Sequence, residues 1–143
     1  MKQQLMRKTF TSLVLLAAMF YTGASNAHFY NNGFLFNQTT QVLTLTCPAG
    51  TAQASVAVLD GTANAGIMSV TVFQGGSAQV ASDSSQGNGV YGSFATVSGG
   101  AGPYYLIVSQ TASLISLYKL TYHCEDANGT ELAALPTLVV TQP

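Results

Sequence analysis

Charged side chains are scarce in this sequence: only 6% of the 143 residues are Asp, Glu, Lys or Arg, and tryptophan is absent. Three of the four Lys and Arg residues precede position 28, and Lys119 is the only one after it. Beyond that position one lysine stands against five acids, a net charge of −4. A partner with many phosphates needs many cationic contacts, so we expect no nucleic acid partner and no role at a charged membrane surface.

The first 27 residues have the pattern of a cleavable secretory signal peptide. A basic head precedes an apolar run over residues 13–21, and the small residues Ser25 and Ala27 follow it. The run is shorter than the roughly 20 residues that a membrane-spanning helix needs. We therefore expect cleavage after Ala27, with cleavage after Ala24 as the alternative, and no membrane span in the mature form.

Removal of residues 1–27 leaves residues 28–143, which is a typical length for one domain with one hydrophobic core. The leader is typical of bacterial export, and we expect the mature protein to be secreted, periplasmic or held at the cell surface. The glycosylation acceptor patterns at Asn37 and Asn128 matter only in a eukaryotic secretory route and are discounted.

The sequence has only two cysteines, Cys47 and Cys124, and export would place both in an oxidising compartment. A disulfide between them is the simplest prediction, with a metal site or a redox pair as alternatives that the wide spacing disfavours. Strand alternation places Cys47 on one face with Leu45, and Cys124 on one face with Tyr122. Both faces are apolar and should point inward, while His123 should point outward.

Apolar residues recur in short bursts separated by Gly, Asn, Ser and Pro, with no sustained helical period. The pattern predicts an all-β fold, a jelly-roll-like two-sheet sandwich of eight or nine strands with one disulfide. The predicted strands cover residues 42–47, 54–59, 67–73, 78–81, 91–97, 104–109, 116–124 and 138–141, with a further one over 34–39.

A resemblance to a known family follows from four segments. They are Cys-Pro-Ala-Gly-Thr at 47–51, the apolar strand at 54–60, the Gly-x-Tyr-x-apolar-x-Val strand at 102–108, and Tyr-x-Leu at 118–120. Over residues 34–122 the chain resembles the bacterial pre-peptidase C-terminal (PPC-like) domain family. The resemblance implies a jelly-roll-like sandwich that acts as an accessory, non-catalytic module, usually attached to a secreted enzyme.

Common catalytic signatures are absent from the sequence: it has no Gly-x-Ser-x-Gly, no His-Glu-x-x-His and no phosphate-binding Gly-x-x-x-x-Gly-Lys. We therefore expect no enzymatic activity. Glu125, Asp126 and Glu131 flank the turn at Asn128-Gly129, where acids are ordinarily solvated. A weak calcium loop and a catalytic pair of carboxylates are the alternatives for this cluster.

His28 and His123 are the only histidines. Cleavage after Ala27 would free the amine of His28, and amine and imidazole nitrogens together suit copper. With His123 as a further ligand, the arrangement resembles the histidine brace of lytic polysaccharide monooxygenases and some periplasmic copper carriers. The alternative is a terminal histidine left by processing and an outward strand residue with no metal.

Aromatic residues crowd the expected mature amino terminus, and tyrosines recur along the strands. Such residues either pack in the core or, when exposed, stack on sugars. The sequence thus favours a non-catalytic exported domain with a binding or surface-structural role, its partner a glycan or a surface protein. A copper-binding protein and a carbohydrate-binding module are the alternatives.

Overall fold

The computed structural model describes residues 27–36, 39–63, 66–112 and 114–142, so the predicted signal peptide lies outside the described residues except for Ala27. No stretch within these ranges forms a helix that could cross a membrane. Nine strands are present: β1 (His28–Leu35), β2 (Thr40–Cys47), β3 (Gln53–Asp60), β4 (Met68–Gln74), β5 (Ser77–Asp83), β6 (Ala95–Ser98), β7 (Gly102–Gln110), β8 (Ser116–Glu125) and β9 (Thr137–Gln142).

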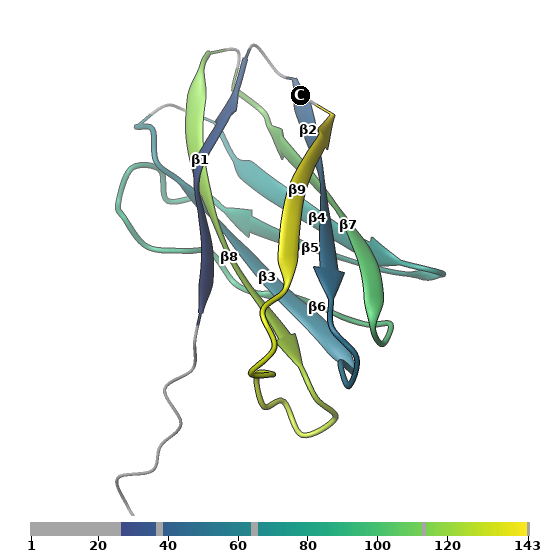
Figure 1. Cartoon of the computed structure of the whole chain (residues 1–143). Helices are drawn as coiled ribbons and strands as arrows, with labels where there is room; N and C mark the ends of the chain where they lie inside the picture. Colours follow the sequence, from purple (N-terminus) through teal and green to yellow (C-terminus); the bar gives the residue numbers. More distant parts are fainter. Residues whose placement is uncertain (1–26, 37–38, 64–65, 113, 143) are drawn as a thin grey trace, which may run out of the picture.

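The strands form two antiparallel sheets that pack against each other (Figure 1). One sheet has the order β1-β8-β3-β6 and the other the order β5-β4-β7-β2-β9. Alternate residues of strands from both sheets make one buried apolar cluster between them, as the pleat of a strand requires. The prediction of an all-β, two-sheet sandwich is confirmed.

Seven predicted strands match the structure to within two residues at each end, and the other two differ by more. The strand predicted over 34–39 is β1, which begins at His28 and ends at Leu35. β1 is an edge strand, and its outward residues need not be apolar. The sequence therefore shows no regular alternation of apolar and polar residues at the start of β1. The strand predicted over 91–97 is reduced to β6, since Gly92 leaves the regular ladder. A Cβ at Gly92 would lie 2.3 Å from the carbonyl oxygen of Ser82.

The predicted disulfide between Cys47 and Cys124 is present and joins the two sheets through β2 and β8. Both cysteines are buried, and their Cα atoms lie 5.7 Å apart. In the chain-entropy model, a crosslink across a loop of this length removes about 4 kcal/mol of conformational freedom from the unfolded chain. The disulfide is therefore a main support of the sandwich.

Tyr118, in β8, connects the sheets at the middle of the core. Its side chain is fully buried, and its hydroxyl donates a hydrogen bond to Oε1 of Gln41 in β2. Burial raises the pKa of Tyr118 well above its usual value, so the phenol stays neutral. The ring lies directly over Gly33, where an added Cβ would come within 2.2 Å of a ring carbon. Only glycine fits at that position of β1.

Two buried acids join the sheets where β3 and β5 end. Asp83 accepts hydrogen bonds from the backbone N–H groups of Asp60 and Ser85, each at 2.8 Å and each to a different oxygen. Asp60 accepts one from the N–H of Thr62 at 2.9 Å. The backbone oxygen of Asp60 also accepts from the N–H of Gly87, at 3.0 Å. These bonds fix the loops that follow β3 and β5.

Burial raises the pKa of Asp60, the Thr62 N–H lowers it in part, and the nearby charge of Asp83 raises it further. A raised folded-state pKa contributes stability that is fully present below the unfolded value of 3.8 and is lost as pH rises through the folded value. The ionised Asp60 therefore costs stability at neutral pH.

Asp60→Asn should raise the urea midpoint at pH 7, because it removes that charge and keeps an oxygen for Thr62. The gain should shrink as pH falls toward the unfolded value of 3.8, because the wild-type carboxyl, with its raised pKa, takes up its proton before that pH is reached. The matched variant Asp83→Asn should cost about 1–3 kcal/mol at pH 7, since an amide offers one acceptor oxygen instead of two. Urea denaturation at both pH values measures the midpoints of the wild type and of the two variants. A lower urea midpoint for Asp60→Asn than for the wild type at pH 7 would show that the ionised Asp60 does not destabilise the fold.

Candidate functional site

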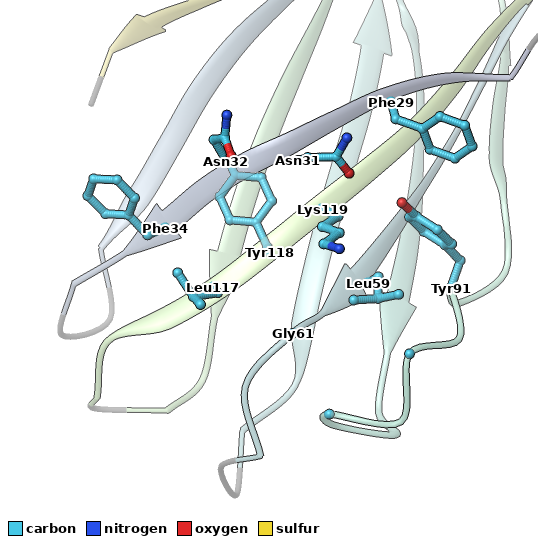
Figure 2. A pocket seen from close by; sticks show the side chains of 12 residues that line it. Phe29, Asn31, Asn32, Phe34, Leu59, Gly61, Tyr91, Leu117, Tyr118 and Lys119 are labelled. Atoms are coloured by element: carbon cyan, nitrogen blue, oxygen red, sulfur yellow. The ribbon is translucent and has the colours of Figure 1, made fainter.

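A groove with a volume of about 850 Å³ lies on the outer face of the β1-β8-β3-β6 sheet (Figure 2). Its walls come from β1, from β8, from the end of β3 and from the loop between β5 and β6. The residues that line it are Phe29, Asn31, Asn32, Phe34, Leu59, Gly61, Gly87, Gly89, Tyr91, Leu117, Tyr118 and Lys119.

A β-bulge in β1 shapes the middle of this groove. Tyr30 pairs with Leu120 and Gly33 pairs with Tyr118, so two residues of β1 stand opposite one residue of β8 between these pairs. The two are Asn31 and Asn32, and the single residue opposite them is Lys119. A bulge re-aims side chains that regular pleating would send to opposite faces. Both amides therefore line the groove beside the lysine.

Aromatic and aliphatic side chains form the two ends of the groove. Figure 2 shows Phe29 and Tyr91 at one end and Phe34 and Leu117 at the other, with Lys119 between them. The ring centroids of Phe29 and Tyr91 are 6.3 Å apart, and their planes are inclined at 40°. Phe29 is 54% exposed and Phe34 48% exposed, which is high for phenylalanine. Burial raises the pKa of Tyr91, so its hydroxyl is neutral and can donate a hydrogen bond.

The polar groups in the groove are not used to hold the fold together. Lys119 is exposed, and the ion pairs found among the described residues do not include it. The side chains of Asn31 and Asn32 are likewise exposed and make no hydrogen bond to any other described residue. The groove thus offers one ammonium and two amides to a ligand.

A second cluster brings the two histidines to one carboxylate. Nε2 of His28 lies 3.4 Å from Oε1 of Glu131, and Nδ1 of His123 lies 3.3 Å from Oε2. The Glu131 side chain is only 9% exposed, and neither oxygen accepts a hydrogen bond from a described residue. His28 stacks on Tyr122, and His123 packs against Phe94 at 5.5 Å. Buried carboxylates are unfavourable without a partner, so the imidazoles are the groups that compensate Glu131.

The three acids near the Asn128-Gly129 turn have separate surroundings. Asp126 accepts hydrogen bonds from the N–H groups of Thr130 and Asn128, and these bonds lower its pKa. Glu125 accepts from Gln53 and Ser55. Glu131 turns away from solvent toward the histidines, which differs from the solvated position expected for it. Over the described ranges, no three His, Cys, Asp or Glu side chains are arranged to hold a metal ion.

A hollow of about 400 Å³ adjoins this cluster and is lined by Ser55, Phe94, His123, Glu125, Gly129 and Glu131. His123 lies on the face of β8 opposite Cys124, as alternation predicts, but Phe94 and Glu131 cover it. Its side chain is therefore only 14% exposed. The imidazole borders this hollow.

Comparisons of the chain with protein-family models, curated proteins and solved structures found no match. The resemblance to the PPC-like family therefore stays a prediction. Sequence reasoning identified His28, His123 and the disulfide, but it did not single out Asn31, Asn32 or Lys119. The one available signal was that Lys119 is the sole cationic residue after position 8.

Proposed function

We propose that this chain is an exported, non-catalytic binding domain and that the groove lined by β1 and β8 is its carbohydrate-binding site. The proposal rests on one observation: exposed aromatic rings and unpaired amides surround the same groove. Phe29, Tyr91 and Phe34 supply flat apolar surfaces, and Asn31 and Asn32 supply donors and acceptors.

This combination suits a sugar better than a fully apolar ligand. A pyranose has apolar C–H faces that pack on aromatic rings, and its hydroxyl groups hydrogen-bond to amides and phenols at their edges. Small-molecule sites typically combine an apolar lining with a few well-placed polar groups. The side chains of Asn31 and Asn32 can bind hydroxyl groups without giving up any bond within the protein.

The remaining features agree with an exported binding domain. A disulfide between β2 and β8 is the kind of crosslink that persists in an oxidising compartment, which supports a secreted, periplasmic or cell-surface location. The resemblance to PPC-like domains implies the same class of accessory module. The proposal also includes that the protein is bacterial and that its signal peptide is cleaved after Ala27.

Tyr91→Ala should weaken glycan binding about tenfold, because it removes one of the two rings at one end of the groove. The matched control is Tyr105→Ala. Tyr105 is also a partly exposed tyrosine beside a phenylalanine, Phe73, but it lies on the other sheet. A glycan array followed by calorimetry on the bound glycan measures the effect. Equal losses in the two variants, or no bound glycan at all, would refute a sugar site in this groove.

Copper binding is a second candidate, and the contacts of Glu131 favour it. This carboxylate brings His28 and His123, far apart in sequence, to opposite oxygens of one group. Imidazole nitrogens suit copper, and cleavage after Ala27 would add the amine of His28 as a further nitrogen. Within the described ranges no three His, Cys, Asp or Glu side chains are arranged to hold an ion, so copper would have to draw the two imidazoles together around Glu131.

Copper titration of the processed protein tests this candidate. We expect one ion per chain, and His28→Ala and His123→Ala should each weaken binding by about tenfold or more, since each removes one of few ligands. Glu125→Gln, in the same hollow but without contact to either imidazole, is the matched control for Glu131→Gln. Absence of one-to-one copper, or unchanged affinity in both histidine variants, would exclude the site.

A further inference from the structure

We infer that the groove selects a saccharide that carries one carboxylate, a single uronic acid among neutral sugars, and that Lys119 binds this carboxylate. The inference rests on the proposed carbohydrate site and adds the chemical class of its ligand. It starts from the position of the only lysine in a domain that has almost no positive charge.

The groove differs in charge from the rest of the domain. Lys119 is the only Lys or Arg after position 8, and it lines the groove of about 850 Å³. None of the five acids lines that groove. Asp60 and Asp83 are buried and accept hydrogen bonds from backbone N–H groups, and Glu131 is largely buried beside the histidines. The groove is therefore the cationic spot of an otherwise acidic domain. Ligands with a negative group are the complement of such a spot.

The local geometry matches a carboxylate. The bulge in β1 places the amides of Asn31 and Asn32 opposite Lys119, so that an ammonium and two amide NH₂ groups border the same part of the groove. A carboxylate accepts several hydrogen bonds at once, and those from an ammonium are stronger than neutral ones. Since Lys119 pairs with no described acid, ligand binding breaks no ion pair of the protein.

The number of carboxylates is limited by the net charge. With one lysine against five acids, the mature domain repels a polyanion. Such repulsion acts over about 8 Å at physiological ionic strength, which reaches the sugars directly next to the bound one. A ligand with one carboxylate gains the contact with Lys119 and brings little further repulsion. Neutral sugars on either side then match the aromatic ends formed by Phe29 and Tyr91 and by Phe34.

Matched pairs of oligosaccharides test this inference. The probes are oligosaccharides of xylose, glucose, galactose or mannose with one glucuronate, each beside its neutral methyl ester. A trimer of galacturonate serves as the polyanion. Binding is measured on an array and then by calorimetry. For at least one pair we expect the acid to bind about fivefold tighter than its ester, which is the upper end of the range for one solvent-exposed ion pair.

Variants of the lysine assign the preference to one side chain. Lys119→Met keeps the aliphatic stem and should abolish the preference for the acid while the ester still binds. Lys119→Arg should retain it. Gln79→Glu is the matched control, because it lowers the net charge equally from exposed β5 in the other sheet and should leave the preference unchanged.

The outcomes separate this inference from the proposed function. Equal binding of acid and ester, or a preference that survives Lys119→Met, overturns the role of Lys119 and leaves the carbohydrate site standing. Tighter binding of the galacturonate trimer overturns the limit to one carboxylate. If neither the pairs nor any neutral glycan binds, both the inference and the proposed function are wrong.

Discussion

The pairing of β1 with β8 is the interaction on which the groove depends. β8 is fixed in the sandwich by the disulfide at Cys124 and by Tyr118, which is buried and reaches Gln41 in the opposite sheet. β1 must follow β8 with glycine under the Tyr118 ring, and it reaches that register only through a two-against-one bulge. The bulge leaves Asn31 and Asn32 opposite Lys119. Core packing on the inner face thus determines which polar groups meet on the outer face.

The opposite wall of the groove has a different support. Tyr91 lies in the loop between β5 and β6, and this loop is tied to the end of β3 by the Gly87 N–H and by Asp83. The two acids that organise these loops are buried, and the ionised Asp60 carries an electrostatic cost at neutral pH. The wall is therefore built from backbone hydrogen bonds around Asp60 and Asp83. Such a wall holds its shape without a ligand, which favours binding with little loss of conformational entropy.

Most of the fold could be predicted from the sequence because it follows from local rules. Alternation placed Cys47 and Cys124 on inward faces, and the structure joins them. The start of β1 could not be predicted, since an edge strand needs no regular alternation and the bulge depends on its partner. Glu131 was expected in solvent because turn acids usually are. Its contacts with His28 and His123 arise because the start of β1 lies beside the end of β8, which no local pattern contains.

On this proposal, the bulge in β1 makes the middle of the groove a ligand-binding surface. Nuclear magnetic resonance of the side-chain amides during titration with the glucuronate-bearing oligosaccharides tests it most directly. We expect the amide signals of Asn31 and Asn32 to shift in a saturable way, while those of Gln79, exposed on β5 of the other sheet, and Asn128, exposed in the turn after β8, stay in place. Shifts confined to Gln79 or Asn128, or no shift at Asn31 and Asn32 at saturation, would contradict it.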